Sequence, residues 1–140
     1  MTTSIDTNVL TALWHPDDSL NTIAKSAMDD EMMRGDLVVS APVFAELCAA
    51  PGRTESFVDY FLNDSAISID WDLDEQIWRT AARAFHAYAS GRRKRSAPGP
   101  RRILADFLIG AHALRRGYRL LTLDTGIYQS AFPRLTIVAV

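Results

Sequence analysis

The chain has 140 residues, 48% of them hydrophobic and 23% charged, and its formal net charge is −2. This composition is that of a globular protein, which excludes a disordered chain, and the net charge excludes a uniformly basic nucleic-acid-binding protein. The one cysteine, Cys48, leaves no internal disulfide and fits a reducing compartment. No apolar run reaches the roughly 20 residues of a membrane span. We therefore expect a cytoplasmic protein without membrane association, with residues 1–140 as a single domain.

Short apolar segments alternate with helical segments through the first half of the chain. The elements expected there are, in chain order, a strand at 3–5, a helix at 19–33, a strand at 37–40, helices at 42–50 and 54–62, and a weak strand at 66–69. Asp18 or Ser19 caps the first helix, and Gly35 follows its end. Pro42 suits the first turn of its helix, which Pro51 and the following glycine end.

The second half continues the alternation. It predicts a helix at 72–90, a basic loop at 91–102, a helix at 102–116 closed by Gly117, and strands at 119–123 and 135–140. Asp72 and Glu75 have the spacing of a helix cap and its third residue, and Gly91 is placed to end that helix. Short apolar strands separated by helices indicate an α/β fold with a parallel sheet covered by helices on both faces. Ligands bind such sheets at the carboxyl ends of the strands.

Two acidic residues follow apolar strands. Asp6 comes directly after the first strand, and Asp124 ends the segment RLLTLD. Both carboxylates are therefore expected at the carboxyl edge of the sheet. Strand ends are also ordinary places for turn-forming aspartates, so either residue alone has an equally good structural explanation.

A third acid stands alone in an apolar helix. Asp106 is the only charge in LADFLIGAHAL, and a buried charge is costly unless it is paired, hydrogen-bonded, neutralised or metal-bound. Its nearest neighbours on the helix surface, Gly110 and Ala113, are small, which leaves space over the carboxylate. The alternative is an acid near a helix amino terminus, stabilised by the helix dipole and paired with Arg101 or Arg102.

Glu46 repeats this pattern as the only charge in APVFAELCAA, with a lone acid at the helix surface as the alternative. If all the acids converge on the carboxyl edge, their repulsion requires a counter-ion. Oxygen ligands suit one or two Mg²⁺ or Mn²⁺ ions, and no Cys/His spacing indicates zinc. Such a cation lowers the pKa of a bound water molecule and makes it a nucleophile. The proposed metal ligands and catalytic residues are Asp6, Glu46, Asp106 and Asp124.

Four motifs in this order resemble the PIN-domain family, most closely the VapC-type toxins: SIDTNVL, FAEL, ADFLIGAHAL and LLTLDTGIY. The resemblance spans nearly the whole chain. It implies a five-stranded parallel sheet between helices and a Mg²⁺- or Mn²⁺-dependent endoribonuclease that leaves a 5′-phosphate and a 3′-hydroxyl. It assigns the acidic site to the four carboxylates above. Asn8 and Thr122 match polar positions that support this site.

One basic segment stands out from an otherwise acidic chain. The segment GRRKRSAPGPRR contains six cations and no acid, so removing them from the net charge of −2 leaves −8 on the rest. We expect these side chains to contact RNA phosphates, which gives affinity without sequence choice. A solvated loop is nearly as good an explanation. The candidate RNA-binding residues are Arg92, Arg93, Lys94, Arg95, Arg101 and Arg102.

The resemblance also implies partners: a structured RNA such as tRNA as substrate, a small antitoxin encoded nearby, and a second copy of the chain in a homodimer. Two other functions compete with the ribonuclease. A catalytically inactive RNA-binding or scaffold module needs no carboxylate cluster. An aspartate-nucleophile phosphatase has a second aspartate where Asn8 stands. His112 lies about 240° around the helix from Asp106 and is expected to be a packing residue.

Overall fold

The computed structural model describes residues 1–95 and 102–140. Five strands form one sheet in the order β3-β2-β1-β4-β5, and every neighbouring pair is parallel. This confirms the expected fold class. The strands are β1 (Thr2–Ile5), β2 (Asp36–Ser40), β3 (Ile67–Asp70), β4 (Arg119–Thr122) and β5 (Ile137–Ala139).

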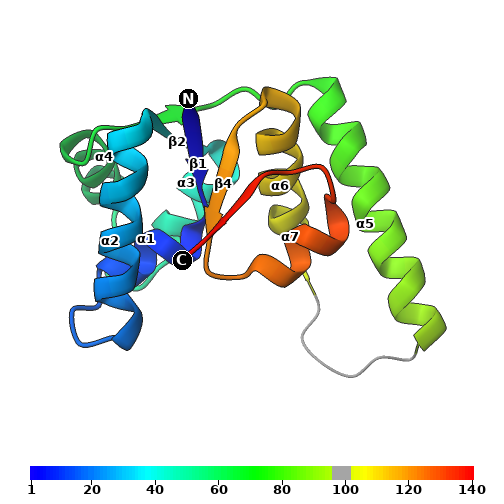
Figure 1. Cartoon of the computed structure of the whole chain (residues 1–140), viewed down its shortest axis with the longest axis horizontal. Coiled ribbons are helices and arrows are strands. Elements are labelled where there is room, and N and C mark those ends of the chain that lie inside the picture. Colours follow the sequence, from blue (N-terminus) through cyan, green and yellow to red (C-terminus); the bar gives the residue numbers. More distant parts are fainter. Residues whose placement is uncertain (96–101) are drawn as a thin grey trace.

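Helices connect the strands and flank them (Figure 1). They are α1 (Thr7–Leu13), α2 (Ser19–Arg34), α3 (Ala41–Cys48), α4 (Glu55–Asp64), α5 (Glu75–Arg95), α6 (Leu104–Arg116) and α7 (Thr125–Ala131). In Figure 1, β1 and β4 run side by side in the centre, with α2 and α4 to one side and α5 to the other. The long helix α5 packs along α6, and α6 packs on β4.

The central strands are buried because both faces of the sheet are covered. Ile5 of β1, Val39 of β2 and Leu121 of β4 are fully buried. Continuous apolar runs are characteristic of parallel strands in this position. Burial of a large aliphatic side chain contributes about 1.5–3 kcal/mol, so these strands fix the sheet that carries the residues at its carboxyl edge.

The sheet order reverses between β1 and β4, since β2 and β3 lie beyond β1 whereas β5 lies beyond β4. Such a switch point opens a crevice at the carboxyl ends of the two strands. Asp6 follows β1 directly, and Asp124 follows β4 after one residue. The helix α6 begins beside the same edge, near the ends of β1 and β4 (Figure 1).

Two short helices of the structure were not expected from the sequence. Each of α1 and α7 has seven residues, too few for periodicity to separate them from turns. The helix α1 begins directly after β1, with Asp6 as its cap. The segment that looked like a strand end and a turn is therefore a strand followed at once by a helix.

The long helix α5 differs from the prediction at both ends. It begins at Glu75 instead of residue 72, and the carboxylate of Asp74, not of Asp72, accepts the hydrogen bond from the Ile77 amide at 3.0 Å. It also continues past Gly91 to Arg95, so the expected basic loop begins later than predicted. Arginine and lysine are good helix formers, and they outweigh one glycine.

In the part of the chain that the structure describes, no helix has both the length and the apolar content that a bilayer crossing requires.

Candidate functional site

The four acids of the sequence analysis line one cavity. It has a volume of about 270 Å³, and its walls come from α1, α3, α6 and α7 at the carboxyl edge of the sheet. Polar side chains complete the lining, which gives the set Asp6, Thr7, Asn8, Thr11, Glu46, Asp106, Asp124 and Tyr128. Oxygen and amide groups therefore dominate this cavity.

Asp6 is the most deeply buried of the four cavity acids, with 5% of its surface exposed. One carboxylate oxygen caps α1 by accepting a hydrogen bond from the Thr7 amide at 2.8 Å. Burial raises the pKa of Asp6 to about 6, although the hydrogen bond from Thr122 and the proximity of the Tyr128 hydroxyl lower it. The negative charge of Asp6 is therefore incompletely compensated by the protein.

Thr122, the last residue of β4, links two of the acids. Its hydroxyl donates to Asp6 Oδ2 at 2.8 Å and accepts from the Asp124 amide at 3.0 Å. Asn8 acts on the same segment, because its side-chain oxygen accepts from the Leu123 amide at 3.2 Å. Both residues thus hold the backbone from which the Asp124 carboxylate projects.

Glu46 reaches the cavity from α3 and lies half-buried. The Thr7 hydroxyl donates a hydrogen bond of 2.6 Å to its carboxylate. Pro42 in the first turn of α3 helps to start this helix directly after β2, which places Glu46 in its second turn. The lone acid of α3 is therefore not a freely solvated surface residue.

Asp106 lies in the first turn of α6. Its carboxylate accepts a long hydrogen bond of 3.4 Å from the Ile103 amide, so part of its role is to cap this helix. Burial raises the pKa of Asp106. Its small neighbour Gly110 faces the Phe132 ring, from which a Cβ at that position would lie 2.3 Å, while Asp106 itself lines the cavity.

Asp124 is the acid with a cationic partner. Nη1 of Arg102 lies 2.5 Å from Asp124 Oδ2, with both side chains about one-third exposed (33% and 38%). The pairing of Arg102 with Asp106, expected if Asp106 were structural, is not the ion pair that forms. The main-chain amide of Arg102 donates to the Tyr88 hydroxyl at 2.9 Å, which fixes this residue against α5.

Sequence reasoning missed Tyr128. This residue lies one helical turn after Asp124 in α7, is 1% exposed, and lines the cavity. Its hydroxyl makes no hydrogen bond of ordinary geometry with any part of the chain that the structure describes. Burial raises its pKa, as do the nearby Asp6, Asp106 and Glu46. The spacing of four after Asp124 was the only available signal.

The donor chemistry of the cavity fits a hard divalent cation. Carboxylates and hydroxyls are the ligands that Mg²⁺ and Mn²⁺ prefer, and the raised pKa of Asp6 and the unpartnered Tyr128 hydroxyl indicate a missing polar partner. Among residues 1–95 and 102–140, however, no three His, Cys, Asp or Glu side chains already form a group that could hold a metal ion. Small side-chain movements within the cavity are therefore required.

The basic segment divides between helix and the residues after it. Arg92, Arg93 and Lys94 belong to the last turns of α5, as does the backbone of Arg95. Arg92 lies close enough to Tyr88 to lower the pKa of that phenol, which the hydrogen bond from the Arg102 amide lowers most. Of the six cations, Arg101 lies outside the described residues.

His112 is fully buried and lies away from the cavity. Its Nε2 is 2.8 Å from Asp70 Oδ2 at the end of β3, and its ring packs edge-on against Tyr118. This matches the expectation of a packing histidine.

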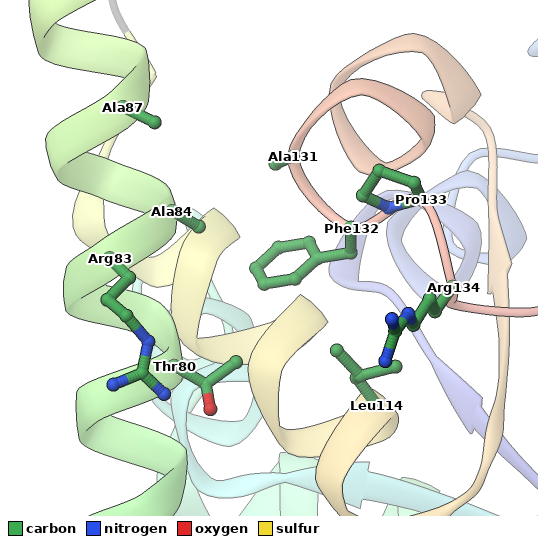
Figure 2. A pocket seen from close by; sticks show the side chains of 9 residues that line it. All are labelled: Thr80, Arg83, Ala84, Ala87, Leu114, Ala131, Phe132, Pro133 and Arg134. Carbon is green, nitrogen blue, oxygen red and sulfur yellow. The ribbon is translucent and has the colours of Figure 1, made fainter.

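A second hollow, of about 390 Å³, lies between α5, α6 and α7 (Figure 2). Figure 2 shows Phe132 pointing across it toward α5, with Leu114 beside it and Arg83 and Arg134 at its rim. None of the residues that line this hollow lines the acidic cavity, so the two are separate.

A model of the PIN domain family matches residues 4–133. No curated protein matches the chain. Solved structures share its fold over nearly full length: VapBC-1 from nontypeable Haemophilus influenzae (18% identity, 99% of this chain and 98% of that chain, TM-score 0.66) and a toxin–antitoxin complex from Klebsiella pneumoniae (18%, 98% and 96%, 0.61). A third is VapC20 from Mycobacterium tuberculosis, a sarcin-ricin loop cleaving toxin (14%, 93% and 95%, 0.59).

Proposed function

This chain belongs to the PIN domain family, and on that premise we propose that it is a metal-dependent endoribonuclease, the toxin of a toxin–antitoxin pair. The observation that carries the proposal is the convergence of four carboxylates from separate segments on one cavity at the switch point of the sheet. The RNA-cleaving activity named for the Mycobacterium tuberculosis structure supports the same reaction class. We take residues 1–140 as one domain, because one sheet combines strands from both halves of the chain.

Asp6 and Asp106 are the proposed principal ligands of one or two Mg²⁺ or Mn²⁺ ions, with Asp124 and Glu46 completing the set. A divalent cation held there supplies the charge that activates water and stabilises phosphoryl oxygens. The chain's own contribution is to aim the ligands: Thr122 orients Asp6, Thr7 orients Glu46, and Asn8 holds the segment before Asp124.

We propose that the basic segment attracts the RNA substrate to the cavity. The acids would repel a polyanion, and cations beside the cavity offset that repulsion. Arg102 lies at the cavity through Asp124, and Arg92, Arg93 and Lys94 lie on the end of α5 that precedes it. Arg95 and Arg101 complete the proposed set. Contacts of this kind bind backbone phosphates and leave the choice of RNA, such as a tRNA, to other features.

The partners of the proposed toxin are a cognate antitoxin and a second copy of the chain. The toxin–antitoxin complex among the structures that share its fold supports the first. On α2, Ile23 is 48% exposed whereas Met28 is buried, so only part of the apolar surface of that helix is accessible to a partner. We propose a cytoplasmic location, which the single cysteine supports because it leaves no internal disulfide to maintain.

The test is cleavage of total RNA by the purified protein with Mg²⁺ or Mn²⁺, with and without EDTA. Asp106→Asn removes one proposed ligand while it keeps the shape of the side chain. Asp29→Asn, at an exposed position on α2, makes the same chemical change away from the cavity. We expect metal-dependent cleavage by the wild type and by Asp29→Asn, and loss of at least about 100-fold in Asp106→Asn.

Other outcomes separate the competing functions. Equal cleavage by wild type and Asp106→Asn contradicts the proposed site. RNA binding without cleavage supports the scaffold module. A trapped aspartyl-phosphate on Asp6 supports the phosphatase, although both Asp6 oxygens are engaged, by the Thr7 amide and by Thr122.

A further inference from the structure

We propose that Arg102 is an exchangeable counter-ion of the acidic cavity: it neutralises Asp124 in the metal-free protein and passes to an RNA phosphate when a divalent cation takes over that carboxylate. The inference rests on the proposed function and deepens it. It gives one arginine of the basic segment a role in loading both the cation and the substrate.

The placement of Arg102 is defined at both its backbone and its side chain. The main-chain amide donates to Tyr88 Oη, a residue of α5. Its guanidinium contacts Asp124 Oδ2 and lies close enough to Asp106 to lower the pKa of that carboxyl, while burial raises it more strongly. Arg102 therefore lies where two proposed metal ligands face each other, and it supplies the positive charge that a cation would supply.

The pair is weak enough to exchange. Both side chains are about one-third exposed, and ion pairs of that kind contribute little to stability because solvent screens them. A divalent cation carries twice the charge and accepts several oxygen ligands at once. It therefore competes effectively for Asp124.

The other arginine ion pairs of the described residues differ in kind: Arg34–Glu31 and Arg79–Glu75 each lie within one helix, and two further arginines join separate elements. Arg116 pairs with Asp70 and Asp74 beside the carboxyl end of α6, and Arg119 pairs with the buried Glu31. Both tie elements together away from the cavity. Only Arg102, among the arginines with a described ion pair, contacts a residue that lines the acidic cavity.

Release from Asp124 leaves the guanidinium at the cavity rim. A phosphodiester bound at the acids lies near this guanidinium, because Arg102 contacts one of those acids. Arginine binds phosphate through two parallel hydrogen bonds. The tether at Tyr88 keeps the backbone in place while the side chain changes partner. The exchange involves no covalent step, since the guanidinium remains charged throughout.

The test measures two affinities in the same variants. Mn²⁺ binding is measured by titration calorimetry without RNA. RNA binding is measured by fluorescence anisotropy of a labelled 20-nucleotide mixed-sequence RNA with Ca²⁺, and a gel checks that the RNA stays intact. The variants are Arg102→Gln and Arg102→Lys. Arg79→Gln is the matched control, since Arg79 forms an exposed ion pair with Glu75 in the first turns of α5. Circular dichroism verifies that each variant is folded.

The proposal predicts effects of opposite sign. Arg102→Gln binds Mn²⁺ about threefold to tenfold more tightly, because a competitor is gone, and binds RNA about threefold to tenfold more weakly. Arg102→Lys retains the charge and lies between, and Arg79→Gln matches the wild type. In an Asp124→Asn background the Mn²⁺ effect of Arg102→Gln shrinks, because the guanidinium has lost its anionic partner.

Failure of this inference differs from failure of the proposed function. Equal Mn²⁺ affinity in wild type and Arg102→Gln, with binding intact in both, overturns the exchange alone. Weaker Mn²⁺ binding in Arg102→Gln makes Arg102 a structural support of the cavity and also overturns it. Unchanged RNA affinity contradicts the transfer to phosphate. If neither the wild type nor any variant binds Mn²⁺, the proposed function is contradicted, and so is the exchange.

Discussion

The hydroxyl of Thr122 donates a hydrogen bond of 2.8 Å to Asp6 Oδ2 across 116 residues of sequence. The same oxygen accepts from the Asp124 amide, so one side chain couples the ends of β1 and β4 where the sheet order reverses. The acids at these two strand ends are therefore positioned relative to each other by a neutral residue. Any change at Thr122 acts on both acids at once.

Thr122→Val is expected to destabilise the protein by about 1–3 kcal/mol, because it leaves a buried carboxylate oxygen and a backbone amide without their partner. Urea denaturation measures the change. Thr136→Val is the control, at an exposed position beside β5, and should change stability by less than about 0.5 kcal/mol. An equal loss of unfolding free energy in both variants would show that the hydrogen bonds of the Thr122 hydroxyl do not stabilise the fold.

The stability of the metal-free protein should fall as pH rises from about 4 to about 6 through Asp6. The pKa of Asp6 in the folded protein is raised from 3.8 to about 6, so the folded state binds the proton more tightly than the unfolded state. Deprotonation therefore destabilises, by an amount on the order of 3 kcal/mol. Denaturation of wild type and Asp6→Asn across this range measures it.

Asp6→Asn removes this titration, so its stability relative to the wild type should increase with pH over the same interval. A constant difference between the two proteins from pH 4 to pH 7 would contradict a raised pKa at Asp6. Mn²⁺ affinity should also weaken below about pH 6, because ligands must be deprotonated to bind a metal.

Gly110→Ala is expected to destabilise the protein by about 1–3 kcal/mol through overpacking. A Cβ at this position would lie 2.3 Å from the nearest atom of the Phe132 ring. Gly126→Ala, where nothing lies within 4 Å, is the control and should be neutral or slightly stabilising. Thermal melts compare the two.

A second substitution checks the cause. In combination with Phe132→Leu, Gly110→Ala should cost less than it does alone, because the flexible leucine yields to the methyl group. If the two losses simply add, the ring is not what excludes a side chain at Gly110.

His112→Leu should reduce stability by about 2–3 kcal/mol, because it removes a buried hydrogen bond to a carboxylate. Burial raises the pKa of Asp70, but His112 and Arg116 together hold it below its usual range. The stabilising contribution of Asp70 is thus present near neutral pH and is lost as pH falls through its folded pKa.

The same variant distinguishes packing from metal binding at His112. His112→Leu should leave Mn²⁺ affinity unchanged, since the imidazole contacts Asp70 instead of the acidic cavity. His86→Leu, at an exposed position of α5, is the control for stability. A loss of metal affinity in His112→Leu that exceeds its loss in the control would contradict the packing role.

Local pattern was sufficient to predict the strands and the acids at their ends. Apolar runs such as LVVS and RLLT are buried on both faces whatever lies far along the chain, so the sequence indicates them directly. A lone carboxylate in an apolar helix was also informative at Asp106 and Glu46, because a charge in such a segment needs a partner.

Pairings between distant residues could not be predicted in this way. Tyr128 looks like any aromatic residue of a short segment, and its place in the cavity depends on how α7 packs. The partner of Arg102 depends on where the chain leaves α5, and this helix runs five residues beyond its predicted end. The close approach of Phe132 to Gly110, 22 residues away, likewise depends on how the segment after α7 packs on α6.

The most direct test of the central claim is the location of a cation in crystals grown with Mn²⁺, from anomalous scattering. We expect a peak in the cavity between Asp6 and Asp106, at coordination distances of about 2.0–2.5 Å from their carboxylate oxygens. The peak should be absent in Asp106→Asn. A peak only elsewhere on the protein, or none in the cavity although the same protein cleaves RNA with Mn²⁺, would contradict the assignment of this cavity as the metal site.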